Sequence, residues 1–332
     1  MSSLQIAPDG RGFLTCVGFG TGGTYCTSDF GRDWRPSQTG MPGRPYLFAM
    51  DIDGFGLAAG NGLLALTRDA GDTWTRIEHG EEIAAVATHA DGTALVCTRH
   101  GAALLTRDHG TTWESLSIAC GGTVEQLCFA APRECFALVK IFPDPTIPEE
   151  EIRSKAYWLS QFDSRSAATP EENWLEAQRE CSHLWQVWSS MSPHTGWSKA
   201  LEARSSWSTL DSCGEMAAIA TDQAVFTRKH AGADWTETPS PQTGVLHLVT
   251  AEKWIIQSEE YVTTADAGST WERRYPPSGN NSKVRCVTNH ERVFALGGNY
   301  AATFTVNESM DAGATWETIH VYNHGHWRHE PS

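Results

Sequence analysis

Positive charge is scarce in this sequence of 332 residues, which has 25 Lys and Arg against 40 Asp and Glu and a formal net charge of -15 at pH 7. No basic cluster offsets this balance, so nucleic acid and anionic lipid are not expected partners. No run approaches 18 consecutive apolar residues, and Met1–Gln5 has no charged region leading into an apolar stretch. Neither membrane insertion nor a signal peptide is therefore predicted, and we expect a cytoplasmic protein.

Cysteine is present without the spacing of a metal or redox motif. The nine cysteines are an odd number and include no Cys-x-x-Cys pair, which favours free, buried thiols in a reducing compartment. Cys16 and Cys26 lie symmetrically about Thr21 in an expected hairpin, so they could face each other across two strands. Two small buried side chains are the simpler interpretation, because a directly cross-strand disulfide strains the preferred geometry.

One eight-residue pattern, Ser/Thr-x-Asp-x-Gly-x-Thr-Trp, recurs along most of the chain. Its Asp can turn its carboxylate onto nearby backbone N–H groups, its Gly can take a positive φ, and its hydroxyls complete a polar turn between two strands. The Trp can cover the turn and donate its indole N–H. We therefore predict that the aspartates are structural, not catalytic. The copies run over 27–34, 67–74, 106–113, 264–271 and 309–316, and contain Asp29, Asp69, Asp108, Asp266 and Asp311.

This pattern resembles the Asp-box, or BNR repeat, of sialidases, sortilin-type receptors and photosystem II assembly factors. The resemblance implies structural clasps set away from the functional face. The repeat length of about 40 residues independently argues for a closed array, because one repeat cannot bury its own apolar face. We predict an all-β fold over 1–332: one seven-bladed β-propeller with four-stranded antiparallel blades.

Residues 83–116 show the four-strand unit most clearly, with strands at 83–87, 94–97, 103–105 and 113–116. A sixth, degenerate copy runs from Arg228 to Trp235. It has His230 in place of the Asp, so we expect a looser turn there.

The fourth unit carries two predicted insertions, at about 141–155 and 164–194. The first is proline-rich, and we expect it to be irregular and to precede a third strand over 156–162. In the second, Thr169, Pro170 and Glu172 predict a helix start, and we expect the helix to run to Met191. Its apolar stripe would pack on the outside of the blade or bind a partner. The stripe comprises Trp174, Ala177, Cys181, Leu184, Trp185 and Trp188.

In this topology, the turns between second and third strands share one face with the links between blades. We expect this face, opposite the boxes, to bind a ligand. The candidate residues are Arg44, Tyr46, Asn61, His100, Glu125, Arg204, Trp207, His247, Glu259, Arg285 and Tyr300.

Three functions are consistent with such a set. A glycoside hydrolase could use a carboxylate pair such as Glu125 and Glu259, although the Arg-Ile-Pro motif that resemblance to sialidases would imply is missing. A metal-dependent enzyme could use His100 and His247 as ligands of a divalent metal, although no cofactor is firmly implied. No catalytic constellation stands out, so we favour a recognition or assembly module. Its partner would be a protein or a small polar or glycan ligand, and resemblance to the photosystem II assembly factors implies a partner polypeptide.

Overall fold

The computed structural model describes residues 3–16, 23–39, 43, 45–60, 62–131, 134–142, 147–161, 168–181, 183–191, 196–258, 260–275, 283–287, 292–299 and 303–323. Within these ranges, the strands form seven sheets of four antiparallel strands, each in chain order. The predicted seven-bladed β-propeller is confirmed.

Blade 1 contains β1 (Ser3–Ile6), β2 (Gly12–Cys16), β3 (Gly23–Thr27) and β4 (Arg35–Pro36). Blade 2 contains β5 (Leu47–Met50), β6 (Gly56–Gly60), β7 (Leu63–Thr67) and β8 (Thr75–Arg76). Blade 3 contains β9 (Ile83–His89), β10 (Thr93–Thr98), β11 (Ala102–Thr106) and β12 (Glu114–Ser117). Blade 4 contains β13 (Thr123–Phe129), β14 (Cys135–Ile141), β15 (His183–Ser190) and β16 (Ser198–Ser205).

Blade 5 contains β17 (Ser208–Cys213), β18 (Met216–Thr221), β19 (Ala224–Arg228) and β20 (Thr236–Pro239). Blade 6 contains β21 (Val245–Leu248), β22 (Trp254–Gln257), β23 (Tyr261–Thr264) and β24 (Glu272–Arg274). Blade 7 contains β25 (Lys283–Val287), β26 (Val293–Asn299), β27 (Thr303–Ser309) and β28 (Glu317–Asn323).

The position of a strand within its blade sets its burial. The first strands of neighbouring blades contact one another, from β1 through β5, β9, β13 and β17 to β21, and β25 contacts β1. The second strands β10 and β18 are buried at every residue, whereas most residues of the fourth strands β12 and β20 are exposed. Adjacent blades cover both faces of a second strand, so those strands are mostly apolar instead of alternating.

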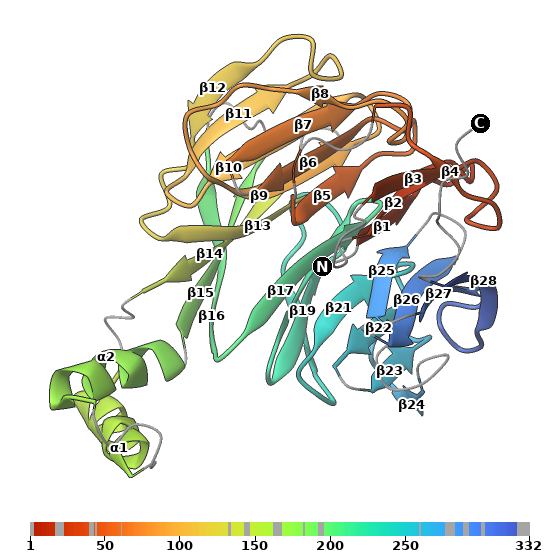
Figure 1. Ribbon diagram of the computed structural model, residues 1–332. Coiled ribbons are helices and arrows are strands. Elements are labelled where there is room, and N and C mark those ends of the chain that lie inside the picture. Colours follow the sequence, from red (N-terminus) through yellow and green to blue (C-terminus); the bar gives the residue numbers. More distant parts are fainter. Residues whose placement is uncertain are drawn as a thin grey trace.

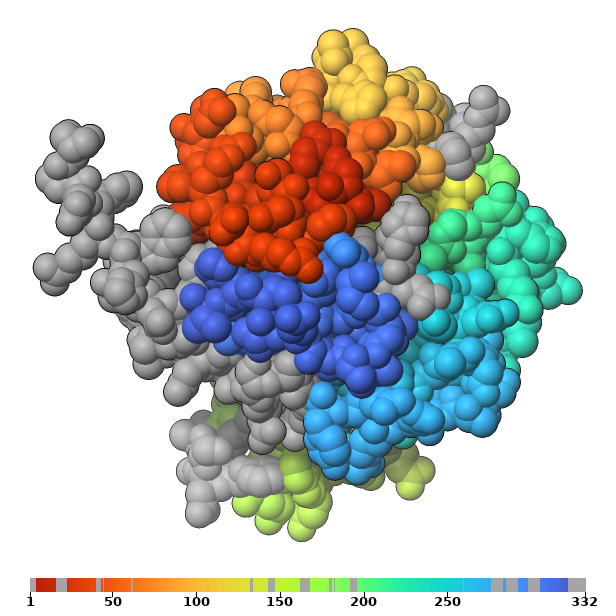
Figure 2. Space-filling model, turned by 90° about the vertical axis from the view of Figure 1, so that its right-hand side faces the viewer, coloured from red at the N-terminus to blue at the C-terminus, as the bar shows by residue number. Residues whose placement is uncertain are grey.

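The ring closes between two complete blades. Leu4 and Leu14 of blade 1 form one buried cluster with Phe294 and Val306 of blade 7, and Figure 2 shows the red first blade lying directly against the blue last blade. Glu308 is buried here and pairs with arginines of both blades. Its partners are Arg32 (Nη2 to Oε2, 3.1 Å) and Arg292 (Nε to Oε1, 3.5 Å). Side chains therefore join the two blades, and each blade comes from one continuous stretch of sequence.

The box turns have the predicted hydrogen bonds. In blade 2, the Gly71 N–H donates to Thr67 Oγ1 (2.8 Å), the Thr73 N–H donates to Asp69 Oδ1 (2.8 Å), and the Trp74 indole donates to the Gly71 carbonyl (2.9 Å). Hydrogen bonds led by that from the Thr112 hydroxyl lower the pKa of Asp108 to about 2. The Asp108 carboxylate therefore stays ionised and accepts hydrogen bonds within the turn.

The residue before the box glycine was not expected to be unusual, but it also has a positive φ. Phe30, Ala70, His109, Ala267 and Ala312 have φ angles between 54° and 64°. A non-glycine residue enters this region at a cost, which the surrounding hydrogen bonds must offset.

The degenerate sixth turn is held differently. Arg228 occupies the Ser/Thr position and forms a buried ion pair with Glu134 of blade 4, while its guanidinium lies over the ring of Phe136 at 5.2 Å. The local polar turn is thus replaced by a contact between blades 4 and 5.

Two predictions for blade 4 are wrong. Residues 156–162 do not form the third strand, because most of them belong to helix α1 (Glu149–Ser160). Helix α2 (Pro170–Glu180) begins with the predicted capping box of Thr169 and Glu172, but it ends at Cys181. The chain then enters β15, which is the true third strand and carries Leu184, Trp185 and Trp188.

Helices α1 and α2 form a hairpin inserted between β14 and β15. They pack on each other through Ile152, Leu159, Ala177 and Cys181, and Figure 1 shows them extending away from the sheets. The predicted apolar stripe therefore does not pack on the outside of the blade. No helix in the described ranges is long and apolar enough to cross a membrane.

The register of blade 1 argues against facing cysteines. Cys16 is the partner of Gly23, and Cys26 is the partner of Phe13, so the two cysteines are not cross-strand neighbours. Cys26 is a free, buried thiol. The Cys16 side chain lies outside what the structure describes.

Candidate functional site

The connectivity divides the turns between two faces of the ring. In an antiparallel meander, the turns after the first and third strands lie at one end, and the turn after the second strand lies at the other end with the link to the next blade. Backbone hydrogen bonds confirm that box turns meet first turns, with Ala70 N–H donating to Gly54 O (2.9 Å) and His109 N–H donating to Gly92 O (3.0 Å). We call this end the box face and the opposite end the connection face.

The candidate residues predicted from sequence fall into three groups. Tyr46, His100 and Trp207 lie in turns or links of the connection face. Glu125, Arg204 and His247 lie within strands β13, β16 and β21. Those outside the described residues are Arg44, Asn61, Glu259, Tyr300 and the side chain of Arg285. The proposed carboxylate pair of Glu125 and Glu259 therefore stays a prediction.

Tyr46 brings two blade links together on the connection face. Its hydroxyl donates to Glu82 Oε1 (3.2 Å), and its ring lies so close to Gly60 that a Cβ there would come within 2.4 Å. Burial and the Glu82 carboxylate raise the pKa of the Tyr46 phenol, while the Arg99 guanidinium acts in the opposite direction. The Tyr46 phenol is therefore neutral, with the acidic Glu82 and the basic Arg99 acting on it in opposite directions. Residue 60 has to be glycine, because any Cβ at that position would collide with the Tyr46 ring.

A second polar group, centred on Asp222, joins blades 4 and 5. Asp222 accepts from the hydroxyls of Ser205 (2.8 Å) and Ser206 (2.8 Å), and Ser205 Oγ also accepts the Trp207 N–H (3.2 Å). The Ser205 carbonyl accepts the Trp185 indole N–H (3.0 Å). Partial burial opposes ionisation, but the serine hydrogen bonds outweigh it and lower the pKa of Asp222. The Ser205 hydroxyl therefore joins the Asp222 carboxylate to the backbone of Trp207, which is partly exposed.

Side chains also bind the free backbone edges of the inner strands. Each first strand has one edge without a partner strand, and in several blades a neighbouring side chain accepts its N–H. The pairs are Gln126 Oε1 with Leu210 N–H (2.6 Å), Thr209 Oγ1 with Leu246 N–H (3.2 Å), Asp211 Oδ2 with Leu248 N–H (2.7 Å) and Gln257 Oε1 with Val284 N–H (3.0 Å). Burial raises the pKa of Asp211 to about 6 despite this hydrogen bond. These contacts hold the first strands of neighbouring blades in place around the centre of the propeller.

Known structures share this fold. The chain is similar to a solved structure titled "YCF48 bound to D1 peptide", with a TM-score of 0.54 and 12% identity over 85% of this chain and 83% of that one. It is also similar to YCF48 from Cyanidioschyzon merolae, with a TM-score of 0.52 and 13% identity over 98% and 97% of the two chains. No protein-family model matches the sequence, and no curated protein matches it. At this identity the similarity shows a common propeller fold.

The described residues contain one group of three side chains close enough to hold a metal ion, and it lies on the box face. It comprises Asp51, Asp53 and His109. Neither His100 nor His247 belongs to it, so a metal at those two histidines stays a prediction. This group was not among the residues predicted from sequence, because the box face was expected to be purely structural. A signal was present: His109 stands where three other box turns have alanine.

Proposed function

We propose that this chain is a recognition module of the Asp-box propeller type, which binds an extended polypeptide segment on its connection face. The observation that carries the proposal is the group of Trp207, Asp222, Ser205 and Ser206. Through the Ser205 hydroxyl, it joins a partly exposed tryptophan to a carboxylate whose pKa is lowered, so the carboxylate is charged at neutral pH.

This chemistry favours a segment that carries Lys or Arg. An indole can receive a cation on its ring face, and a fixed carboxylate can accept a charge-assisted hydrogen bond from the same cation. The net charge of -15 adds a long-range attraction for basic segments. The hydrogen bonds of Asp222 keep the carboxylate in place before the ligand arrives, which reduces the entropy lost on binding.

The structural similarity is consistent with the proposal. A propeller of similar fold is described as bound to a peptide. The serine hydroxyls of the group are already hydrogen-bonded to Asp222. Their chemistry therefore suits a ligand platform better than a nucleophile.

The test is selection from a library of random peptides displayed on phage, followed by calorimetric titration of the selected peptides against the full-length protein. Trp207→Ala should weaken binding by about 1–3 kcal/mol, as expected for an interface anchor, and Asp222→Asn should weaken most strongly the peptides that contain Lys or Arg. Asp108→Ala is the matched control. It alters a box turn on the opposite face, so it should lower the melting temperature and leave affinity unchanged in the folded protein.

Two results would contradict the proposal. If the selected peptides bind Trp207→Ala as tightly as the wild type, the peptide-binding site is not the Trp207 group of the connection face. Loss of binding in Asp108→Ala without a change in melting temperature would place the ligand on the box face instead.

A further inference from the structure

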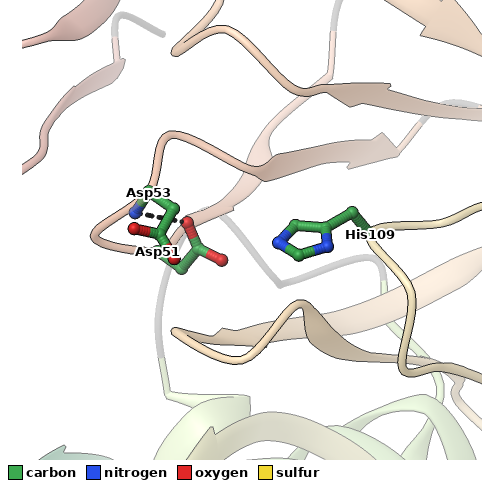
Figure 3. Close-up of side chains that lie close together, drawn as sticks. All are labelled: Asp51, Asp53 and His109. Atoms are coloured by element: carbon green, nitrogen blue, oxygen red, sulfur yellow. Dashed lines mark hydrogen bonds between the residues drawn. The ribbon is translucent and has the colours of Figure 1, made fainter.

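The group of Asp51, Asp53 and His109 is assembled by the fold from two blades. Asp51 and Asp53 lie in the turn between β5 and β6 of blade 2, and His109 lies in the box turn of blade 3. One potential ligand atom from each residue lies within 4.8 Å of the other two. Figure 3 shows the imidazole ring directed toward the two carboxylates.

Asp51 contributes a buried oxygen that the turn does not use. Its Oδ1 accepts the N–H groups of Asp53 (2.9 Å) and Phe55 (3.0 Å), which closes the turn. Its Oδ2 is buried and has no hydrogen-bond partner among the described residues, although Asp51 as a whole is only 6% exposed. Figure 3 shows this second oxygen on the side of His109. A buried carboxylate oxygen without a partner is costly, so it calls for a cation or a donor.

The other two members are equally available. Within the described ranges, no hydrogen bond or ion pair involves the Asp53 carboxylate, whereas the corresponding Asp9 and Asp91 bind the backbone N–H two residues on. The His109 ring packs edge-on against Phe55 at 5.4 Å. It also lies close to Gly92, where a Cβ would come within 2.4 Å of it. Phe55 and Gly92 thus hold the ring toward the carboxylates.

The nearby arginines are directed elsewhere. Arg11 donates to the Asp53 carbonyl (3.0 Å) and pairs with Asp9 (2.6 Å), and Arg68 donates to the His109 carbonyl (2.8 Å). Neither guanidinium forms an ion pair with Asp51 or Asp53 in the described part of the chain. They weaken the local negative potential without supplying the missing partner of Asp51 Oδ2.

We propose that Asp51, Asp53 and His109 bind a first-row divalent metal ion of the Zn²⁺ type, with water completing its coordination. Imidazole and carboxylate together suit such ions. Ligand atoms about 2.1 Å from a tetrahedral ion are about 3.4 Å apart, so a rotation of the exposed Asp53 side chain closes the set. The ion links blade 2 to blade 3 on the box face. This site is independent of peptide binding on the connection face.

The test uses full-length protein in which the tail histidines His324, His326 and His329 are replaced by alanine, because they are a second potential source of metal affinity. Zn²⁺ binding is measured by calorimetry, Co²⁺ binding by visible absorption, and the melting temperature with and without Zn²⁺. His109→Ala should fold, because alanine holds this position at positive φ in three other box turns. His109→Ala and Asp53→Asn should each weaken Zn²⁺ binding at least about tenfold, since even losing an outer partner of a ligand costs about 10- to 100-fold. Both should abolish the rise in melting temperature on adding Zn²⁺.

His230→Ala is the matched control, because His230 is an exposed histidine of another box turn and should bind Zn²⁺ like the parent protein. Saturable 1:1 binding that both ligand variants lose and the control retains supports the site. Absence of saturable binding in the parent, unchanged affinity in either ligand variant, or equal loss in His230→Ala each overturns it.

Discussion

Asp211→Asn should make stability less dependent on pH. Asp211 is partly exposed, yet the inner strands of blades 5 and 6 surround it, and burial raises its pKa from 3.8 to about 6. The folded state therefore holds the proton more tightly than the unfolded state does. The stabilising contribution of the neutral acid is fully present below about pH 4 and is lost as pH rises through about 6.

The magnitude follows from this pKa. A pKa about 2 above the ordinary value corresponds to about 3 kcal/mol, because each pKa unit is equivalent to about 1.4 kcal/mol. Partial exposure screens the charge, so we expect about 2 kcal/mol between pH 4 and pH 7.5. Asparagine can still accept the Leu248 N–H that Asp211 now accepts. Any stability that the substitution itself removes is the same at both pH values, so it cancels when the two pH values are compared.

The assay is urea unfolding of the wild type and Asp211→Asn at pH 4 and pH 7.5. The variant should gain about 2 kcal/mol relative to the wild type on going to the higher pH. Asp222→Asn is the control, because the pKa of Asp222 is lowered from 3.8. Asp222 contributes stability that is present above its unfolded pKa and is lost as pH falls through its lower folded pKa, so the difference between this variant and wild type should change little between pH 4 and pH 7.5. An equal difference between Asp211→Asn and wild type at both pH values would refute the reasoning.

Two further predictions concern contacts between blades. Arg228→Thr restores the box residue but should lower the free energy of unfolding by about 3–5 kcal/mol, because it leaves the Glu134 carboxylate buried without its partner. Replacing both residues by Met and Leu should cost much less in the same denaturation experiment, and equal losses would contradict a charge effect. Glu308→Gln should cost about 1–2 kcal/mol by weakening ring closure, since Glu308 is buried but Arg32 is half-exposed. Glu317→Gln, on the exposed neighbouring strand of the same blade, should be neutral, and equal melting temperatures for the two variants would rule out that role for Glu308.

Most of the fold could be predicted because each box turn marks the end of a third strand. The intact copies placed the blade boundaries, and the expected end of the second insertion at about 194 lies just before the fourth strand of blade 4. The stretch without an intact box was less certain. Leu184, Trp185 and Trp188 continue a helical spacing from Trp174, but they also fit a half-buried strand, and short apolar segments do not distinguish the two.

Helix α1 was missed although its start had a visible signal. Glu149, Glu150 and Glu151 occupy the first turn, where negative charge interacts favourably with the helix dipole, and a proline precedes them. The prolines of this insertion predict irregular structure, and that expectation hid the helix start.

The candidate site was less accessible from sequence than the fold. Topology assigns residues to a face, so the position of Tyr46 and Trp207 on the connection face could be predicted, but topology does not say which side chains meet. The Asp222 group depends on two serines with no pattern of their own. The group around His109 depends on contact between successive blades, and that contact distance is set by packing.

Closure by complete blades has a consequence for synthesis of the protein on the ribosome. Each sheet pairs only strands that are consecutive in the chain, so blades can form one after another as the chain emerges. Leu4 and Leu14 of the first blade cannot be covered until Phe294 and Val306 arrive. Throughout that interval the nascent protein exposes an apolar sheet face at its N-terminal end, which a chaperone could shield and where a copy stalled before the last blade would aggregate.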